Sequence, residues 1–409
     1  MNVNMSRMKV AVVGGSIAGC VAASLLHRDG HDVQVFEKSS APLVGRGASI
    51  TTPMTVLAEC VNEGLLTPDL AHSQLSGIDY ICPAEDGEDF RWLGTANLTF
   101  AAVTWTDLYA QLRSGVPDDR FHLGKQVIRV IIRREEALVQ FSDGVQTPYD
   151  LVVFADGYQS IGRLDIDKTI TLHQEQCVLV RGITPAFDSD MHLQNKAIRT
   201  LYRGGHGVAY LIPDKGMSSR RDERSVSWAY YAAATDGNAP TQAIRSAKST
   251  DAAESTLQHE HKHAWKDEFD RLRALVPRYF SDLVERTAAI HVHSLWSVQA
   301  QERVSERSCL IGDAGSIFPP FTASGVFKAV GNAVSLRNAL RSQVQLSEAL
   351  TAWNRDQSKN EAKTRTDYQR YAKHLIYDVP DLRSADIAES NLFLEQLHPG
   401  IHWCLPTEG

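Results

Sequence analysis

The chain has 409 residues, of which 43% are hydrophobic and 22% are charged. This composition is close to the globular average, so extensive disorder is excluded and two or three domains with a large buried core are expected. The formal net charge of −7 and the pI of about 6.1 argue against nucleic acid or an anionic membrane as the main partner.

Cysteine usage and the first apolar run indicate the compartment. The six cysteines are scattered and include no C-x-x-C pair, which argues against a zinc ribbon or a disulfide framework and favours a reducing environment. The apolar run that starts at Val10 is broken by Gly14 and Gly15, too early for a secretion signal or a membrane span. We therefore expect a cytoplasmic protein.

The stretch KVAVVGGSIAGC, residues 9–20, predicts a strand, a glycine turn and the start of a helix. It has two functional interpretations. As a phosphate loop, Gly14-x-Ser16-x-x-Gly19 is G-x-G-x-x-G with serine in place of the middle glycine. As a nucleophile elbow, it makes Ser16 a hydrolytic serine, although the last glycine of G-x-S-x-G is missing. A glycine turn without a ligand is the third possibility.

The next strand, HDVQVFEK at residues 31–38, favours the phosphate loop. It ends in Glu37, which lies 23 residues after Gly14. An acid about twenty residues after the loop is placed to hydrogen-bond a ribose. A hydrolase would also need an oxyanion loop upstream, and only eight residues precede Lys9.

Further elements follow in order along the chain. Residues 76–104 predict short strands, and Thr104–Leu112 predicts a helix whose Thr-x-x-Asp start resembles a capping box. Three more strands and a turn are expected at Val127–Ile132, Leu138–Phe141, Leu151–Phe154 and Ser142–Gly144.

The second half predicts a sheet followed by helices. The expected elements are a mainly antiparallel sheet over Cys177–Ala232, a loop or lid at 233–255, a charged helical zone at 256–287, a strand at Cys309–Gly315, a long helix at Gly325–Leu340 and amphipathic helix to about Leu382. His259 and His263 share a helix face, but no third ligand is evident, so a solvated helix is expected there and no metal site.

Two later motifs settle which interpretation of the first loop we adopt. DLVVFADGYQSIGR, residues 150–163, is a strand that runs into Asp156-Gly157, and CLIGDAGSIFPPFTASGVFKAVGNAVSL, residues 309–336, is a strand, a proline loop and a helix. With the first loop and VGRGASI, they resemble the three fingerprints of FAD-dependent aromatic hydroxylases, the class A flavoprotein monooxygenases of the p-hydroxybenzoate hydroxylase fold. The run GGSIAG…GRGASI, followed by TWTDLY, looks closest to the 2,6-dihydroxypyridine hydroxylase branch.

The resemblance covers most of residues 9–340 and implies an α/β fold. This fold is a Rossmann-like FAD-binding domain with an inserted, mainly antiparallel β-sheet substrate domain and a C-terminal helical region. The expected boundaries are 1–75, 104–175 and 296–345 for the FAD-binding domain, 76–103 and 176–295 for the substrate domain, and 346–409 for the helical region.

The resemblance also assigns cofactor contacts to positions in this chain. The pyrophosphate cradle would be Gly14, Ser16, Ile17, Ala18 and Gly19. The adenosine half would meet Glu37, Lys38 and the backbone of Val127. The phosphates or ribityl chain would meet Arg46 and Asp313, and Asp156 with Gly157 would serve both FAD and a transiently bound nicotinamide. The flavin pyrimidine edge would face the chain at Pro320, Ala323, Ser324, Gly325 and Val326. FAD is expected to be non-covalent, and NAD(P)H is expected as a transient co-substrate.

Several positions depart from the family pattern close to the flavin ring. Ser316 replaces a usual His, Ala323 a glycine and Phe327 an Asn. Asn332 stands where an acid is usual, and Trp105 where an Arg is usual. These departures leave the identity of the substrate open.

The implied activity is an NAD(P)H- and FAD-dependent monooxygenase that hydroxylates an aromatic or heteroaromatic compound with O₂ through a flavin C4a-hydroperoxide. The alternatives are an oxidase or non-redox flavoprotein of the same fold, a flavin-binding regulator without turnover, and a flavin-dependent halogenase, whose W-x-W-x-I-P segment is absent. Whether the protein forms a homodimer is left open.

The substrate is expected between the flavin and the β-sheet. Phe318 and Pro319 would form one wall, and Tyr210 and Trp228 the opposite wall. His206 or Tyr210 would activate a ring hydroxyl. Arg181 could orient a substrate oxyanion or be an ordinary arginine at a strand end, and the cavity could instead be lined from Arg181 or the 76–104 segment.

Overall fold

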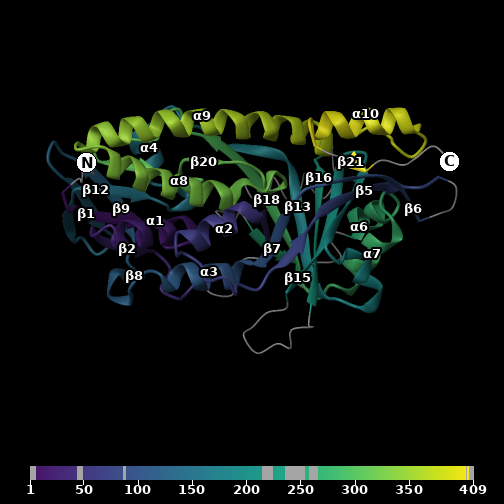
Figure 1. Ribbon diagram of the computed structural model, residues 1–409, viewed down its shortest axis with the longest axis horizontal. Helices are drawn as coiled ribbons and strands as arrows, with labels where there is room; N and C mark the ends of the chain where they lie inside the picture. The colour runs from purple at the N-terminus through teal and green to yellow at the C-terminus, as the bar shows by residue number, and fades with distance from the viewer. Residues whose placement is uncertain are drawn as a thin grey trace.

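Two β-sheets with helices packed on both form the molecule, and one long helix runs alongside them (Figure 1). The computed structural model describes residues 6–43, 49–85, 89–213, 224–234, 254–257, 266–401 and 403–404. Within this part of the chain, no helix is long and apolar enough to cross a membrane.

The first sheet is entirely parallel and is built from segments far apart in the sequence. Its order is β19-β12-β1-β2-β8. The strands are β1 (Lys9–Val13), β2 (Asp32–Glu37), β8 (Phe121–Leu123), β12 (Leu151–Phe154) and β19 (Ser308–Leu310). Strands that are covered on both faces need continuous apolar runs, and LVVF in β12 and VAVV in β1 are such runs.

Different elements pack on the two faces of this sheet. On one face pack α1 (Ile17–Arg28) and α8 (Ser324–Ser342), with Val10, Val12 and Ile311 in the shared core. On the other face lies a small sheet of β9 (Val127–Ile132), β10 (Ala137–Phe141) and β11 (Gln146–Tyr149). The strands that we expected here from the sequence are confirmed, and β11 is an addition.

The second sheet has ten strands and is antiparallel except where β14 pairs with β5. Its strands are β5 (Gly77–Pro83), β6 (Phe90–Ala96), β13 (His173–Pro185), β14 (Lys196–Tyr202), β15 (Gly205–Pro213), β16 (Arg224–Ala233), β17 (Glu254–Leu257), β18 (Ile290–Gln299), β20 (Ser316–Ile317) and β21 (Trp403–Cys404). The mainly antiparallel sheet expected from the sequence is therefore confirmed. Since β13 begins before residue 176 and β18 ends after residue 295, the sheet extends beyond the boundaries that we expected for the substrate domain.

Side chains alternate between the two faces of this sheet, and the alternation places the aromatic residues. Trp228 and Tyr230 of β16 face α6 (Lys266–Arg273) and α7 (Arg278–Arg286), in a core that includes Phe280. Tyr231 faces the other way and packs in a core with Phe321. We call these the outer and the inner face.

A second small sheet lies between the two large ones. It consists of β3 (Ser49–Pro53), β4 (Ser73–Leu75) and β7 (Phe100–Thr104), and it leads into α2 (Met54–Asn62) and α3 (Trp105–Ser114). One half of the capping box predicted for α3 is present, because the Thr104 hydroxyl accepts a hydrogen bond from the Asp107 amide at 3.1 Å. The Asp107 carboxylate accepts a hydrogen bond from the Thr104 hydroxyl, at 2.6 Å, and not from the Thr104 amide as a full box requires.

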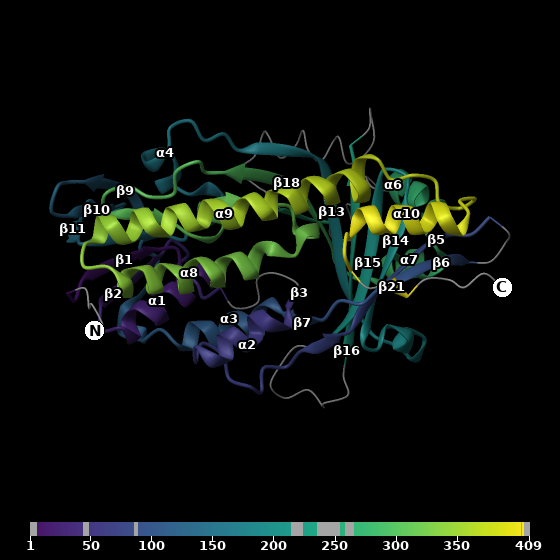
Figure 2. The same cartoon turned by 45° about the horizontal axis from the view of Figure 1, so that its top comes forward.

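The C-terminal region spans both large sheets (Figure 2). Helix α9 (Leu346–Ala372) packs along α8, and the π-helical turn Lys373–Tyr377 that continues it buries Leu375 and Ile376 against the inner face. A further helix, α10 (Ile387–Leu397), lies inside the expected helical region 346–409 but beyond Leu382, where the predicted amphipathic helix ends. The sequence predicted a helical zone from residue 256 onward, but Glu254–Leu257 forms the strand β17.

Candidate flavin and substrate site

The glycines of the first loop are required by close backbone contacts. Gly14 has a φ of +98°, which favours glycine, and a Cβ there would overlap the carbonyl group of Ala155. A Cβ at Gly19 would overlap the carbonyl oxygen of Gly14. Helix α1 therefore crosses directly over the loop, and Gly14 and Gly19 meet the requirements for the first and third glycines of a dinucleotide loop.

Ser16 lies at the N-cap of α1, and its side chain makes no cap hydrogen bond. The first turn of α1 contains no acidic residue. The amides of this turn are thus available to an anion, and the helix dipole favours negative charge there. No histidine or carboxylate among the described residues hydrogen-bonds to Ser16, so the hydrolase interpretation lacks its catalytic partners.

Glu37 braces this loop from the end of β2. It is buried, its Oε2 accepts a hydrogen bond from the Gly15 amide at 2.9 Å, and its Oε1 accepts one from the Ser39 amide at 2.8 Å. Both carboxylate oxygens of Glu37 therefore already accept a hydrogen bond from a backbone amide, without a ribose. Lys38 beside it is exposed and Val127 is buried at the start of β9. The predicted contact Arg46 lies outside the described residues.

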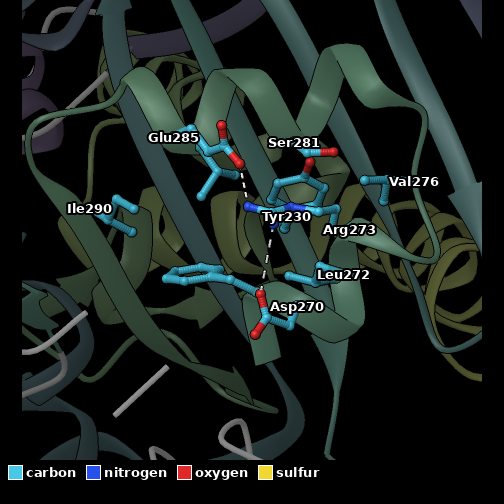
Figure 3. A pocket seen from close by; sticks show the side chains of 10 residues that line it. Tyr230, Asp270, Leu272, Arg273, Val276, Ser281, Glu285 and Ile290 are labelled. Atoms are coloured by element: carbon cyan, nitrogen blue, oxygen red, sulfur yellow. Dashed lines mark hydrogen bonds and ion pairs between the residues drawn. The ribbon is translucent and has the colours of Figure 1, made fainter. Parts of the chain in front are cut away.

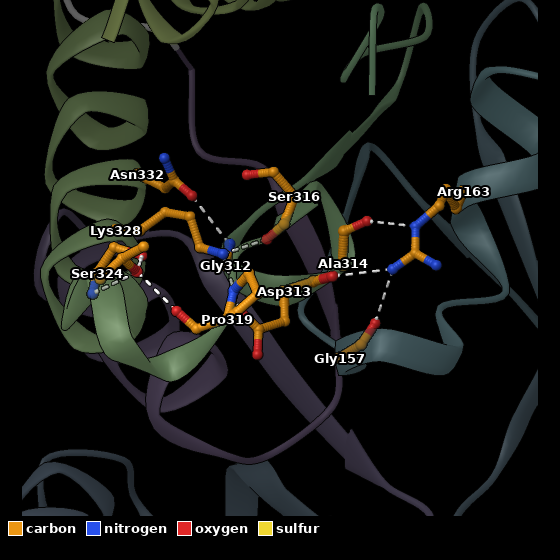
Figure 4. Close-up of polar contacts among 11 residues, drawn as sticks. Gly157, Arg163, Gly312, Asp313, Ala314, Ser316, Pro319, Ser324, Lys328 and Asn332 are labelled. Carbon is orange, nitrogen blue, oxygen red and sulfur yellow. Dashed lines mark hydrogen bonds and ion pairs between the residues drawn. The ribbon is translucent and has the colours of Figure 1, made fainter. Parts of the chain in front are cut away.

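A single arginine connects the two later motifs (Figure 4). The Arg163 guanidinium donates to the carbonyl oxygens of Ala314 at 3.0 Å and Asp313 at 2.9 Å in one loop. It also donates to the carbonyl oxygens of Tyr158 at 2.8 Å and Gly157 at 3.2 Å in the other. Arg163 is nearly fully buried, so these bonds fix the two loops relative to each other. The sequence motif contained this arginine, but no role was predicted for it.

Asp156 presents an unsatisfied oxygen at the end of β12. Its Oδ2 accepts a hydrogen bond from the Ile161 amide at 2.9 Å, whereas its Oδ1 is buried and has no hydrogen-bond partner. Burial raises the pKa of this carboxyl group. A buried acceptor without a donor is costly, so this atom fits a hydroxyl or amide supplied by a bound molecule.

Asp313 and its neighbours shape the opposite side of the cradle (Figure 4). The Asp313 side chain is 53% exposed, and its Oδ1 accepts a hydrogen bond from Lys328 Nζ at 2.8 Å. Lys328 also donates to the carbonyl oxygen of Ser316. Asn332, which replaces an acid of the family pattern, accepts a hydrogen bond from the Gly312 amide at 2.9 Å. These contacts hold the Gly312–Asp313 turn with one side of the carboxylate open.

The N-terminus of α8 supplies a second uncapped helix end. Ala323 adopts the left-handed conformation with φ +52°, and no side chain caps the helix. Gly325 is exposed with open space where its Cβ would be, and no hydrogen bond from the Gly325 or Val326 amide occurs in the described part. The Ala323 amide, however, donates to the carbonyl oxygen of Pro320 at 2.9 Å. The prediction that this amide faces the flavin is therefore wrong.

Together these features fit FAD. Two uncapped helix ends, a glycine loop with no room for a Cβ at Gly14 or Gly19, and a buried unsatisfied carboxylate oxygen all lie in the segments that the fingerprints predicted. The α1 end suits a pyrophosphate, and the α8 end suits a group that gains negative charge on reduction.

On the inner face of the second sheet, three hydroxyl groups form a chain. The Tyr210 hydroxyl lies 2.9 Å from Ser49 Oγ, and Ser49 Oγ lies 2.5 Å from Ser227 Oγ. Tyr210 is half-buried and Ser227 is buried. Ser49 follows the VGRGASI glycines, so the chain joins the predicted flavin-binding segment to the sheet. Ser49 and Ser227 were not predicted as site residues.

The prediction that His206 activates the substrate is not supported by its surroundings. The ring is fully buried, it stacks on Tyr231 with centroids 4.6 Å apart, and its Nδ1 lies 3.0 Å from the carbonyl oxygen of Leu375. Burial holds the pKa of His206 well below its usual value. An enclosed, neutral imidazole has no access to substrate and is a poor base.

Trp228 faces the wrong side for the predicted wall. Its indole Nε1 donates to Thr287 Oγ1 at 2.8 Å, and its ring packs edge-on against Tyr230 on the outer face. It is 1% exposed. Trp228 is therefore a core residue under α7 and not part of a site on the inner face.

The proline loop meets the sheet through a different aromatic residue than expected. Phe318 is buried against Tyr368 of α9, with ring centroids 5.8 Å apart, and Pro319 is buried beside it. Phe321 instead approaches the inner face, 5.6 Å from the Tyr231 ring. Phe321 was missed because the sequence does not show which aromatic of FPPF points to the sheet.

Arg181 lies half-buried on the inner side of β13. Its Nε donates to His293 Nε2 at 2.8 Å. Burial lowers the pKa of His293 to about 3, so this imidazole is neutral and accepts the bond. Arg181 as a substrate contact stays a prediction.

The histidines considered as metal ligands, His259 and His263, lie outside the described residues. In the parts of the chain that are described, no group of three or more His, Cys, Asp or Glu side chains could hold a metal ion.

Comparison with known proteins defines the class of fold. Residues 12–68 match the family model of the NAD(P)-binding Rossmann-like domain. The structure of 2,6-dihydroxypyridine-3-hydroxylase from Arthrobacter nicotinovorans aligns with a TM-score of 0.79 at 23% identity, covering 91% of this chain and 94% of that one. The protein therefore has the fold of the FAD-dependent aromatic hydroxylases, as the sequence resemblance predicted.

Two named relatives indicate an enzyme class and a cofactor. The 2,6-dihydroxypyridine 3-monooxygenase of Paenarthrobacter nicotinovorans is 25% identical over 348 residues, which are 84% of this chain and 86% of the relative. The structure of Klebsiella pneumoniae HpxO in complex with FAD and uric acid aligns with a TM-score of 0.74 at 16% identity, covering 97% of this chain and 94% of that one. These comparisons support the enzyme class and the cofactor that we predicted, an FAD-dependent monooxygenase.

Proposed function

We propose that the protein is an NAD(P)H- and FAD-dependent monooxygenase that hydroxylates an aromatic or heteroaromatic compound bearing a ring hydroxyl or oxo group. The observation that carries this proposal is the cradle in which Arg163 joins the Asp156 and Asp313 loops beside the Gly14 turn. The hydroxylated pyridine and the uric acid named for the two relatives support the substrate class.

Bound FAD would supply electron transfer from NAD(P)H to O₂ and delivery of one oxygen atom, which the resemblance assigns to a C4a-hydroperoxide. The protein's own residues would bind and orient. The α1 N-terminus would hold the pyrophosphate, with Gly14 and Gly19 leaving room for it. Asp156 Oδ1 would accept a hydrogen bond from the cofactor, and Asp313 would bind it on the exposed side of its carboxylate.

Tyr210 would accept the proton of the substrate's ring hydroxyl. A ring hydroxyl becomes a better donor of electrons to oxygen when it loses its proton, and a positioned tyrosine can take part in that transfer. Tyr210 would take the substrate proton while passing its own proton to Ser49, and the half-buried Ser49 would release a proton to water; buried Ser227 would hold Ser49 in place. In this role Tyr210 replaces His206, which is buried and neutral.

The test has two stages. The purified protein should carry non-covalent FAD that is released on denaturation, and colourless protein that does not take up FAD would refute the proposal. A panel of hydroxypyridines, hydroxybenzoates and purine-diones should then contain a compound that accelerates NAD(P)H oxidation. With ¹⁸O₂, one labelled atom should enter the product. NAD(P)H oxidation that yields only hydrogen peroxide would favour the oxidase alternative.

A second experiment separates binding from proton transfer. Tyr210→Phe should retain FAD and substrate-stimulated flavin reduction, but it should lower product formed per NAD(P)H consumed, most strongly at low pH where ring hydroxyls stay protonated. Ser49→Ala should give the same pattern to a smaller degree. Wild-type coupling in both variants at every pH would remove the hydroxyl chain from the mechanism.

A further inference from the structure

A cavity of about 400 Å³ lies on the outer face of the second sheet, under α6 and α7 (Figure 3). Its apolar lining consists of Tyr230, Phe269, Leu272, Val276, Val284 and Ile290. Because Trp228 and Tyr230 point to this face while Ser227 and Tyr231 point to the other, the sheet separates the cavity from the flavin side. The volume is in the range of small-molecule sites.

One polar atom inside the cavity has no partner. Tyr230 is 1% exposed, and its hydroxyl makes no hydrogen bond within the described residues. Burial holds the pKa of this hydroxyl well above its usual value, so it remains a proton donor. A phenylalanine would fill the same space without burying an unsatisfied group, so the hydroxyl is unfavourable unless something in the cavity pairs with it.

Three of the described residues that line the cavity form surface ion pairs. Arg273 of α6 pairs with Glu285 of α7 and lies 3.9 Å from Asp270, and all three side chains are at least half exposed. Such pairs are weak in water and are screened by salt, so they permit opening. They also satisfy the charge of Arg273, which leaves no unpaired cation to attract an anionic ligand.

We propose that this cavity binds a neutral, mainly apolar small molecule of aromatic size, whose single hydrogen-bonding atom pairs with the Tyr230 hydroxyl. The apolar walls supply most of the affinity and the hydroxyl supplies orientation. The inference does not depend on the proposed function, because the site shares no residue with the flavin cradle or with the inner face.

The probes are 2-naphthol and naphthalene, which differ by one hydroxyl group, measured by calorimetric titration of the FAD-loaded protein without NAD(P)H. Tyr230→Phe should weaken 2-naphthol roughly five- to tenfold, as expected for one hydrogen bond, and leave naphthalene unchanged. Tyr149→Phe, the same change at a buried tyrosine of β11, should leave 2-naphthol binding at wild-type strength.

Val284→Trp, which fills the cavity from α7, should abolish binding of both probes while the flavin spectrum stays that of the wild type. This variant keeps the proposal testable if Tyr230→Phe does not fold. The proposal is overturned if the wild type binds neither probe, if Tyr230→Phe binds 2-naphthol as tightly as the wild type, or if Val284→Trp leaves binding intact.

Discussion

Arg163 shows how one side chain can organise a cofactor site without touching the reaction. Its planar guanidinium has five donors in a fixed geometry, and here they reach four carbonyl oxygens in two loops. A lysine at the same position would offer a single point charge and could satisfy only part of this set. The buried carbonyl groups left over would then lack donors.

We therefore expect Arg163→Lys to lower the free energy of unfolding by about 2–3 kcal/mol, the range for unsatisfied buried polar groups. FAD affinity should fall at least tenfold, because the two loops lose their common anchor. Arg133→Lys is the matched control: Arg133 is 56% exposed and pairs only with Glu136. Urea unfolding and flavin fluorescence titration measure the two effects. Equal losses in both variants would contradict the anchoring role.

Asp313 and Ser16 should respond very differently to truncation. Asp313 keeps an exposed carboxylate beside Lys328, whereas the Ser16 side chain makes no cap hydrogen bond. Asp313→Ala should therefore reduce FAD affinity by more than tenfold, and Ser16→Gly by no more than a few-fold. Ser16→Ala should keep turnover within a few-fold. Inactive Ser16→Ala protein that still binds FAD would restore the catalytic-serine hypothesis.

Among single residues, the sequence correctly predicts the position of those whose role depends on local backbone geometry. Gly14, Gly19 and Glu37 follow from the spacing of one strand-turn-helix unit. The contact between Ser49 and Tyr210 joins residues 161 apart, and no local pattern encodes it. Trp228 was placed on the wrong face because the alternation of a strand gives two faces but does not say which one meets the flavin.

At the scale of elements, the crossing of α1 over the first loop is the tightest contact described. Gly19→Ala should place a methyl group into the carbonyl oxygen of Gly14, so we expect loss of FAD binding and severe destabilisation. Gly331→Ala in α8 meets open space and should stabilise the apoprotein by about 0.5–1 kcal/mol, the usual gain in a helix interior. Thermal unfolding with and without FAD separates the two. Wild-type FAD affinity in Gly19→Ala would show that the loop can move away.

Elements with a strong periodic or capping signal were predicted well, as α3 and α8 show. Strand β17 was missed because ESTL is short and polar and forms a strand only by pairing with β18. Helix α10 begins at a capping box of Asp386 and Glu389, a signal that the sequence does contain and that could have identified it. Tertiary pairing, rather than local propensity, determines the edge strand.

At the scale of the whole molecule, stability should fall in acid. Burial lowers the pKa of His293 and of His398 to about 3 and holds that of His206 well below normal. Below the unfolded-state value of about 6.5, the unfolded chain binds protons that the folded protein excludes, so the free energy of unfolding decreases as pH falls. Asp156, with its raised pKa, opposes this trend in part.

His206→Phe should remove one of these contributions, about 2 kcal/mol of the loss between pH 6.5 and 5.0. Urea unfolding of the wild type and of His206→Phe at both pH values provides the comparison. The idea fails if His206→Phe loses as much stability in acid as the wild type.

The order of strands in the first sheet has a consequence for how the protein is made. Strand β1 is synthesised first, yet the sheet is closed by β19 and then covered by α8, both of which follow β5 to β18, the greater part of the second sheet, in the chain. At translation rates of 5–20 residues per second, the early apolar strands wait roughly 15–60 s for these partners. We therefore expect exposed apolar strands to make the nascent chain prone to aggregation, and we expect the flavin to bind only after α8 has been synthesised.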